Sequence, residues 1–455
     1  MHAVAAPSEV REFLQGHPET RFADVLLADS SGVLRGKRVT AAELPGVFAR
    51  GFFLPGSMFA LDVLGGTIEA TGLGFDDGDA DRACLPIPAT LFPVPWLDPG
   101  VAQVQVAMHE VDGRPFFGDP YHVLGGVLER FACSGLKPVV AIELEFYFVD
   151  RERLGGMPRP PASPRTGRRE FRTQINSMED LDDYSAVLAD IAAACALQDV
   201  PTGTALAEYG PGQFEVNLRH VDDARRACDH AIRLKRLVKG IAQKHGMEAT
   251  FMAKPYREMA GSGTHVHVSL LDAGGQNIFA SEQPLGSQAM QHAAAGLLAT
   301  MADGMAVFAP NANSYRRLRP EAYVPMSASW GINNRGVAVR VPVSDAANRR
   351  LEHRVAGADV NPYLLTAWVL AGIHYGVERG LAPPVPLTGN AYRNVGEPLP
   401  GHWAPALERF ERCSFAREYF GERFVALYAA TRRGELEDFS SHVSPLEIDW
   451  YLRSL

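Results

Sequence analysis

Residues 254–269, KPYREMAGSGTHVHVS, carry the side-chain types best suited to chemistry. The last part, residues 263–270, alternates polar and apolar side chains, so on a β-strand His265, His267 and Ser269 share one face. The glycines just before it leave backbone that a ligand can approach closely. The same alternation is typical of any half-exposed antiparallel strand. Taken alone, this segment is therefore compatible both with a ligand-binding strand and with a hairpin that has one solvent-exposed face.

Charged side chains recur with the same period on other predicted strands. In residues 139–149, Glu143 and Glu145 share a face, where they repel each other and a cation relieves the repulsion. In residues 213–218, Glu215 points away from the apolar side chains, and Glu208 precedes that strand. In residues 350–355, Glu352 shares its face with two arginines. Packed as neighbours, these strands would line a cavity that is stable only if metal ions and anionic ligands complete it.

The predicted lining offers five glutamates and one histidine to metal, and several arginines to anions. Hard oxygen ligands in this number suit Mg²⁺ or Mn²⁺ rather than a structural zinc ion, which prefers cysteine in a closed tetrahedral site. Divalent cations with arginines at close range are the components of phosphoryl transfer. The sequence contains neither GxxxxGK[ST] nor GxGxxG, so it predicts neither a P-loop nor a Rossmann nucleotide site.

The composition is typical of a globular protein, with 46% hydrophobic and 21% charged residues in a chain of 455, a length that suggests two or three domains. A formal net charge of −9 argues against general binding to nucleic acid or to anionic membranes. The first residues lack the features of a signal peptide, and no apolar run is long enough to span a bilayer. Five cysteines without a CxxC pair indicate reduced thiols. We therefore expect a cytoplasmic protein with small-molecule partners.

The order of predicted elements is that of an α+β protein divided near residue 115. A short helix over residues 10–15 precedes a hairpin with strands at 22–28 and 33–39, and another strand covers 101–111. Asp119 followed by Pro120 predicts a helix that ends near Gly135. The other predicted helices cover residues 177–197, 222–245, 287–308, 362–377, 404–428 and 445–452.

Two long segments are predicted to be irregular loops. Residues 61–81 are rich in glycine and aspartate, and most of these carboxylates are expected to be solvated. Residues 151–172 are rich in proline, glycine and arginine and are expected to project into solvent. Contact of this second loop with a neighbouring subunit or a nucleic acid is the alternative.

The chain resembles the glutamine synthetase family. KPYREMAGSGTHVHVS matches the ATP-region signature of that family, and IELEF, EYGPGQFE, NSYRRL, NNRGVAVRVP, RRLEHR and ADVNPYL occur in the family's order across nearly all of the chain. The resemblance implies a small β-grasp domain at residues 1–115 and a catalytic domain at 116–455, whose curved antiparallel sheet forms a partial barrel with helices. It also implies active sites between adjacent subunits of a homo-oligomeric ring, usually a dodecamer of two hexameric rings.

The same resemblance implies roles for individual residues. One metal ion would be bound by Glu145, Glu208 and Glu215, and a second by Glu143, His265 and Glu352. Nucleotide contacts would fall on His267, Ser269, Arg335, Arg340 and Arg350, with Arg335 also catalytic. Glutamate would be held by Glu145, Gly261, Arg317 and Arg354. In the implied reaction, which needs ATP and Mg²⁺ or Mn²⁺, the γ-carboxylate of glutamate is phosphorylated and an amine then attacks the acyl phosphate.

The chain departs from a glutamine synthetase that uses ammonium at the amine side. The family carries on its flap a glutamate that helps to bind and deprotonate ammonium, and by spacing that position is Tyr323. The asparagine before the glycine-rich turn is replaced by Ala260. The aspartate that completes the ammonium pocket aligns best with Asp62, whose carboxylate could accept a proton from an alkylammonium. Tyr323 and Asp62 are therefore expected to act at the amine side of catalysis.

An aromatic residue in place of an anionic one favours a nucleophile with a carbon chain. EYGPGQFE, YVPMSASWGINNR and LTGNAY are also more similar to the γ-glutamylpolyamine synthetase branch of the family. We therefore expect an ATP-dependent ligase that joins glutamate to a primary amine, either a polyamine such as putrescine or a monoamine with an apolar or aromatic tail. A glutamine synthetase that uses ammonium is one alternative. A catalytically silent relative with a regulatory role is another, although such a copy would be free to lose buried carboxylates that are costly without metal. Tyr392, in LTGNAY, is expected to be structural.

Overall fold

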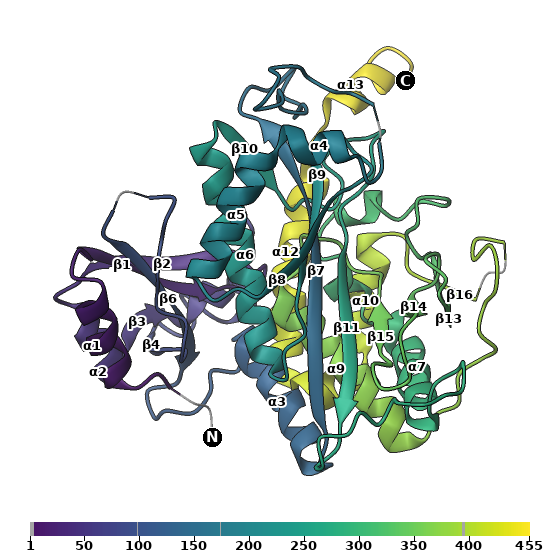
Figure 1. Cartoon of the computed structure of the whole chain (residues 1–455), viewed down its shortest axis with the longest axis horizontal. Helices are drawn as coiled ribbons and strands as arrows, with labels where there is room; N and C mark the ends of the chain where they lie inside the picture. The colour runs from purple at the N-terminus through teal and green to yellow at the C-terminus, as the bar shows by residue number, and fades with distance from the viewer. Residues whose placement is uncertain (1–3, 98, 173, 394–395) are drawn as a thin grey trace.

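The computed structural model describes residues 4–97, 99–172, 174–393 and 396–455 (Figure 1). A small sheet formed by the first part of the chain lies to one side, and a larger sheet with most of the helices forms the rest. The long strand β7 (Lys137–Asp150) runs through the middle of the larger part beside β11 (Thr264–Leu271). The predicted α+β class is confirmed.

The small sheet has the strand order β2-β1-β6-β4-β3, with β5 paired to β6. Its strands are β1 (Phe22–Ala28), β2 (Leu34–Thr40), β3 (Phe52–Pro55), β4 (Asp81–Pro86), β5 (Phe92–Pro93) and β6 (Val101–His109). The predicted hairpin is present as β1 and β2, and β1 also lies parallel to β6. Helices α1 (Pro7–Gly16) and α2 (Leu44–Arg50) complete this unit, and their apolar residues Val10, Val47 and Phe48 are buried.

The acidic segment at residues 61–81 is irregular, as predicted. It contains the 3₁₀ helix η2 (Glu69–Thr71) and an isolated bridge between Leu61 and Thr67, and it follows another 3₁₀ helix, η1 (Gly56–Phe59). The segment packs against the C-terminal part of the chain, where Glu435 accepts a hydrogen bond from the backbone N–H of Val63 at 2.8 Å. This contact ties the small unit to the rest of the molecule.

The larger sheet has the order β13-β14-β15-β11-β7-β9-β8, with β10 paired to β7. In addition to β7 and β11 its strands are β8 (Thr202–Ala207), β9 (Gln213–Leu218), β10 (Met247–Thr250), β13 (Trp330–Ile332), β14 (Val339–Val341) and β15 (Leu351–His353). The prediction of an antiparallel sheet is wrong at one edge, because β13 and β14 are parallel. A separate short pair joins β12 (Ser327–Ala328) to β16 (Glu397–Pro398).

Helices pack against the larger sheet and against one another. α3 (Pro120–Cys133) and α6 (Ala224–Lys244) pack on β7, and α9 (Pro362–Arg379) packs on α3, α6 and α7 (Gln288–Met301). α3 begins as predicted, because the Asp119 carboxylate accepts a hydrogen bond from the backbone N–H of Tyr121 at 2.9 Å. No helix within the described part of the chain is long and apolar enough to cross a membrane.

Three predicted helices are each divided in the structure. Residues 177–197 form α4 (Met178–Asp183) and α5 (Ser185–Leu197), and residues 287–308 form α7 and α8 (Met305–Phe308). Residues 404–428 belong to α10 (Trp403–Arg412), α11 (Ser414–Phe420) and α12 (Glu422–Ser441), with α13 (Pro445–Tyr451) after them. Cys413 has extended backbone and Gly421 has φ of 86°, and neither conformation continues a helix.

The division of the chain at residue 115 stays a prediction. The last long strand of the small sheet ends at His109 and α3 begins at Pro120. However, Phe116 lies in the core of the small sheet together with Leu427 of α12, so residues from both parts of the sequence share that core.

Asn361 is expected to stabilise the junction of the two units. Its side-chain oxygen caps α9 by accepting hydrogen bonds from Tyr363 and Leu364, and its amide donates to the backbone oxygen of Asp29 in the β1–β2 turn at 2.8 Å. Asn361→Ala should lower the apparent free energy of unfolding in urea by about 1–2 kcal/mol, since it removes a cap and a buried hydrogen bond. Asn361→Ser keeps a capping oxygen but cannot reach Asp29, so it should lose less. Equal unfolding midpoints for all three proteins would contradict this role.

Candidate active site

The register of the larger sheet brings the predicted functional side chains onto neighbouring positions. Directly paired residues on adjacent strands point to the same face of a sheet. The pairs are Glu143–His265, Glu145–Glu215, His267–Glu352 and Arg340–Glu352, carried by β7, β9, β11, β14 and β15. Polar and apolar residues alternate along β7 and β11. The apolar side chains, such as Ile142, Leu144 and Val266, point to the opposite face and are buried in the core. Burial of that face therefore fixes which residues face the site.

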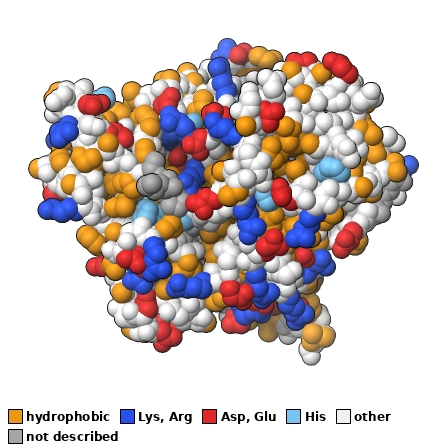
Figure 2. All heavy atoms as spheres, turned by 90° about the horizontal axis from the view of Figure 1, so that it is seen from below, with side chains coloured by type: hydrophobic (Ala, Val, Ile, Leu, Met, Phe, Trp, Pro, Cys, Tyr) orange, Lys and Arg blue, Asp and Glu red, His pale blue; other side chains and the backbone are white. Residues whose placement is uncertain are grey.

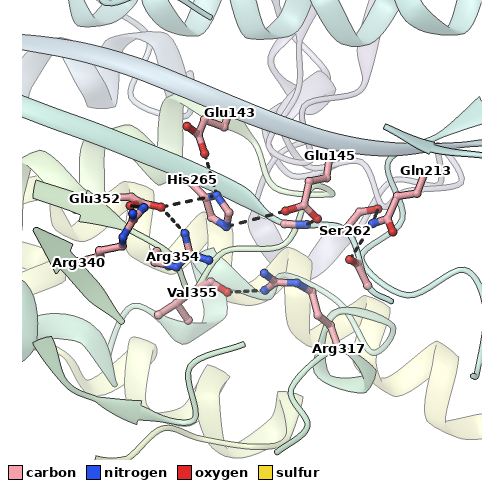
Figure 3. Close-up of polar contacts among 12 residues, drawn as sticks. Glu143, Glu145, Gln213, Ser262, His265, Arg317, Arg340, Glu352, Arg354 and Val355 are labelled. Carbon is pink, nitrogen blue, oxygen red and sulfur yellow. Dashed lines mark hydrogen bonds and ion pairs between the residues drawn. The ribbon is translucent and has the colours of Figure 1, made fainter. Parts of the chain in front are cut away.

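Two groups of side chains bring possible metal ligands together, and Figure 3 shows Glu143, Glu145, His265 and Glu352 among them. Glu143, His265 and Glu352 form one group, and Glu145, Glu215 and His265 form the other, with the ligand atoms of each group within 4.8 Å of one another. His265 lies between them: its Nδ1 is 3.0 Å from Glu143 Oε2, and its Nε2 is 3.9 Å from Glu145 Oε1. All six predicted metal ligands except Glu208 belong to these groups.

Glu208 lies close enough to the second group to interact electrostatically with it. Burial and the charge of Glu145 raise the pKa of Glu208, and burial together with Glu143 and Glu145 raises the pKa of Glu215. Burial disfavours the charged form of each carboxyl, and the neighbouring carboxylates add to this effect. In their ionised forms these carboxylates therefore repel one another, and a cation between them would reduce the repulsion.

The other two glutamates are partly neutralised by the chain itself. Burial alone would raise the pKa of Glu143, but the imidazoles of His265 and His267 hold it well below its usual range. Glu352 pairs with Arg354 and accepts a hydrogen bond from Arg340 Nη1 at 2.8 Å, and these charges outweigh burial and lower its pKa to about 2. Glu352 is therefore paired with cationic side chains, whereas the neighbours that shift the pKa of Glu215 are other carboxylates.

The donor set fits divalent cations such as Mg²⁺ or Mn²⁺. Five carboxylates and one imidazole offer mostly hard oxygen ligands. No cysteine takes part in either group of ligands. Burial, together with neighbouring carboxylates, raises the pKa values of Glu208 and Glu215, and a bound cation would favour their ionised forms.

The residues predicted to hold glutamate form one neighbourhood around Arg317. The Arg317 guanidinium is buried and donates to the backbone oxygen of Val355 at 2.8 Å. A Cβ atom at Gly261 would lie 2.8 Å from Arg317 Cγ, so only glycine fits beside this arginine. The backbone N–H of Gly263 donates to Glu145 Oε2 at 2.7 Å, and Arg354 is held nearby through Glu352. Together they leave buried guanidinium groups close to the carboxylate groups (Figure 3).

The residues predicted to contact nucleotide are only partly assembled. Arg350 Nε donates to His267 Nδ1 at 3.4 Å, and His267 Nε2 lies 2.9 Å from Glu143 Oε1. Arg340 faces the same cluster through Glu352. Ser269 lies further along β11, opposite Val139 and half-buried. Arg335 is exposed on the loop between β13 and β14, and its charge reaches Glu208.

His220 is a neighbour of this region that the sequence did not reveal. Its ring centroid lies 6.2 Å from that of His267. Burial, His267 and Arg350 lower the pKa of His220 to about 4, so this imidazole is neutral at physiological pH. Strand alternation could not have identified it, because β9 ends at Leu218.

Tyr323 lies beside the carboxylate cluster. Its ring stacks on that of Tyr209, which directly follows Glu208, with 6.2 Å between centroids. Tyr323 is 57% exposed and lies on a loop. Its φ of 52° is in the left-handed region, which is uncommon for a residue other than glycine. Tyr392 supports this loop by donating from its hydroxyl to the backbone oxygen of Val324 at 3.2 Å. Tyr209 was missed by sequence reasoning, although its place next to Glu208 was an available signal.

Within one chain, Asp62 is not brought to this cluster. Its carboxylate accepts a hydrogen bond from the backbone N–H of Gly66 at 2.8 Å, and it lines a cavity beside α12. No contact between Asp62 and the predicted metal ligands is found among the residues that the structure describes. Its assignment to the amine side depends on sites formed between subunits, and it stays a prediction.

The chain belongs to the glutamine synthetase family, because the family described as "Glutamine synthetase, catalytic domain" matches residues 117–451. It is 42% identical to the γ-glutamylputrescine synthetase PuuA of Escherichia coli (strain K12) over 451 residues, which cover 99% of this chain and 95% of that protein. It is 33% identical to a glutamate–isopropylamine ligase of Pseudomonas sp. over 462 residues, covering 98% and 97%. A solved structure of a GmaS/ADP complex matches with a TM-score of 0.85 and 28% identity, covering 99% and 100%. The expected glutamine synthetase-type fold, a partial barrel with helices, is confirmed.

Binding of Mg²⁺ or Mn²⁺ to the metal-free protein should release protons. The pKa values of Glu208 and Glu215 are raised, so both carboxyls bind protons above the usual carboxyl range and must lose them to coordinate a cation. Affinity for the cation should therefore increase as pH rises through the range in which these groups titrate. Calorimetric titration in buffers of different ionisation enthalpy measures the protons released.

The matched control is Asp190→Asn, which removes an exposed carboxylate that pairs with Lys244 and His245 on the surface. This variant should bind the cation as the parent does, whereas Glu215→Gln should bind it more weakly and release fewer protons. A cation affinity that does not change with pH would contradict the electrostatic description of the site.

Proposed function

We propose that this protein is an ATP-dependent ligase that forms a γ-glutamyl amide from glutamate and a primary amine. The observation that carries the proposal is Tyr323, an aromatic residue that stacks on Tyr209, which directly follows the predicted metal ligand Glu208. The other five predicted ligands come together in two groups. The similarity to a γ-glutamylputrescine synthetase and to a glutamate–isopropylamine ligase supports an organic amine as the acceptor.

Two divalent cations, Mg²⁺ or Mn²⁺, would be held by the two groups of ligands, with Glu208 completing the second. They would supply positive charge that neutralises the phosphates of ATP. The ligands are Glu145, Glu208 and Glu215 for one ion and Glu143, His265 and Glu352 for the other.

The arginines divide between the two substrates. Arg340, Arg350 and His267 border the cluster on the β14–β15 side, where they would bind phosphate oxygens, and Ser269 would contact the nucleotide further along β11. Arg317 and Arg354, with Gly261 and Glu145 beside them, would bind the carboxylates and the ammonium group of glutamate. Arg335 lies on an exposed loop near Glu208, from which it would reach the transferred phosphoryl group.

In the proposed reaction a γ-carboxylate oxygen of glutamate forms a bond to the terminal phosphorus of ATP, and the bond from that phosphorus to ADP breaks. The amine nitrogen then attacks the acyl carbon, and phosphate leaves with the carboxylate oxygen that it gained. The attacking amine must first lose a proton from its ammonium form. Asp62 of an adjacent subunit would accept it, as the resemblance implies.

Tyr323 and Tyr209 would contact the amine. An aromatic face attracts an organic ammonium through the ring quadrupole and also offers apolar surface to its carbon chain. A small hydrated ammonium ion gains less from such a surface than from a carboxylate. The ammonium-using alternative is therefore disfavoured by Tyr323, and the silent alternative by the intact cluster of buried carboxylates.

We further infer a cytoplasmic homo-oligomer, a dodecamer of two hexameric rings, with no nucleic-acid or membrane partner. All five cysteines are free thiols. Lys and Arg side chains are interspersed with Asp and Glu on the face of Figure 2, which is unlike the basic stripe of a nucleic-acid-binding surface. The C-terminal helix α13 buries none of its residues in this chain.

Phosphate release with Mg²⁺, ATP and glutamate should be fastest with one organic amine when putrescine, spermidine, ethanolamine, methylamine, an arylalkylamine and ammonium are compared. Tyr323→Glu restores a carboxylate and should raise the ratio of kcat/KM for ammonium to that for the best amine about tenfold or more, equivalent to roughly 1.4 kcal/mol. Tyr323→Phe keeps the ring and serves as the matched control, so its amine preference should match the parent. Highest turnover of the parent protein with ammonium would overturn the proposal.

Removal of residues 442–455 should reduce the number of subunits in the assembly, calculated from the mass that light scattering measures. Leu446, Ile448 and Trp450 are 54%, 48% and 57% exposed, and such apolar surface is typical of a subunit interface. The circular dichroism spectrum of the truncated chain should be close to that of the parent, because α13 is short and none of its residues is buried in the chain. An unchanged mass would exclude this segment from the interface.

A further inference from the structure

A cavity of about 780 Å³ lies between the small sheet and the helices of the larger unit. Its wall combines residues 30–34 of the β1–β2 turn, α6, residues 250–252, residues 310–313 and α12. Of the residues assigned to the reaction above, Asp62 alone contributes to this wall. Within one chain the cavity is therefore separate from the cluster of metal ligands.

Two lysines on α6 bring positive charge to this cavity. Lys235 and Lys239 lie one turn apart, and their Nζ atoms are 5.6 and 5.9 Å from the centre of the Phe251 ring. Lys235 Nζ donates to the backbone oxygen of Val360 at 2.8 Å. Within the described ranges of the chain, neither lysine forms an ion pair. The arginines of the wall differ in this respect, because Arg236 pairs with Asp24 and Arg432 with Glu435.

The electrostatic state of the lysines agrees with a missing anion. Burial and the neighbouring charge of Lys239 lower the pKa of Lys235 to about 7, against the opposing attraction of Asp359. An anion between two ammonium groups removes the repulsion that a shared cavity imposes on them.

Trp403 also lines the cavity and is 6% exposed. Its indole Nε1 has no hydrogen-bond partner among the described residues, but this atom is buried and does not face the cavity. The faces of Phe251 and Tyr428 add apolar surface to the same wall.

The wall also carries carboxylates, which are Asp62, Asp359, Glu435 and Asp438. Asp359 Oδ2 accepts hydrogen bonds from Asn311 at 2.8 Å and from Ser314 at 2.7 Å, and its charge attracts Lys235. Glu435 pairs with Arg432, and Asp438 is exposed on α12. The positive charge on α6 that has no ion pair among the described residues is that of Lys235 and Lys239.

We propose that this cavity is a second ligand site, which binds a small organic anion with an apolar or planar part. Its carboxylate or phosphate group lies at Lys235 and Lys239, and its apolar part lies against Phe251. Charge-assisted hydrogen bonds of this kind are the strong ones in protein recognition. The wall includes Asn311 and Asp359, which hold the turn that leads to Arg317, so the bound anion contacts residues that support the glutamate side of the active site.

The test uses phenyl phosphate and benzoate as probes, with inorganic phosphate as the probe without an apolar part, at constant ionic strength. Binding to the full chain is followed by tryptophan fluorescence, since Trp403 lines the cavity, and by calorimetry. Phenyl phosphate, benzoate or both should bind saturably, and Lys235→Gln and Lys239→Gln should each weaken binding about tenfold. Preference for one of the two probes tells a phosphate ester from a carboxylate.

Lys244→Gln is the matched control, because Lys244 lies on the same helix but pairs with Asp190 at 3.0 Å on the surface. This variant should bind the probes as the parent does. Lys239 is exposed, so Lys239→Gln carries the test even if Lys235→Gln fails to fold. Absence of saturable binding to the parent, or equal binding by the parent and all three variants, would overturn the proposal.

Discussion

Repulsion between carboxylates that a sheet forces together is the constraint on which the rest of the site depends. The pairing of β7 with β9 sets Glu145 directly opposite Glu215, and β11 inserts His265 opposite Glu143. Their positions are fixed by the apolar residues on the other face of the same strands, so the chain cannot relieve the repulsion by turning side chains away. Burial then makes the uncompensated charge expensive, and divalent cations are the partners that suit such a site.

The remaining polar groups follow from this arrangement. Arg340 and Arg354 balance Glu352, so one end of the cluster is neutralised within the chain, whereas Glu208 and Glu215 at the other end have raised pKa values and no cationic side chain paired with them among the described residues. The members of the two ligand groups lie on strands β7, β9, β11 and β15. Tyr323, which we assign to the choice of amine, lies instead on an exposed loop. Selectivity can thus vary at the loop without disturbing the ligands on the sheet.

Much of this arrangement was predictable from the sequence, because strand alternation alone identifies the shared faces of Glu143 with Glu145 and of His265 with His267. Which strands are neighbours is not contained in a local pattern, and the resemblance to a family supplied it. The parallel pairing of β13 with β14 was missed, since three-residue strands carry too little periodicity to show direction. The helix breaks at Cys413 and Gly421 were missed because apolar periodicity continues across them. The stacking of Tyr209 on Tyr323 joins segments more than 100 residues apart, and only the folded chain brings them together.

Transfer of a glutamate oxygen to phosphate tests the central claim most directly. Glutamate labelled with ¹⁸O in its γ-carboxylate is incubated with Mg²⁺, ATP and the preferred amine, and the released inorganic phosphate is examined by mass spectrometry. One labelled oxygen is expected in each phosphate, since the carboxylate oxygen leaves with the phosphoryl group that it attacked. Phosphate without label, formed at the same rate as the amide, would contradict activation of glutamate at this cluster.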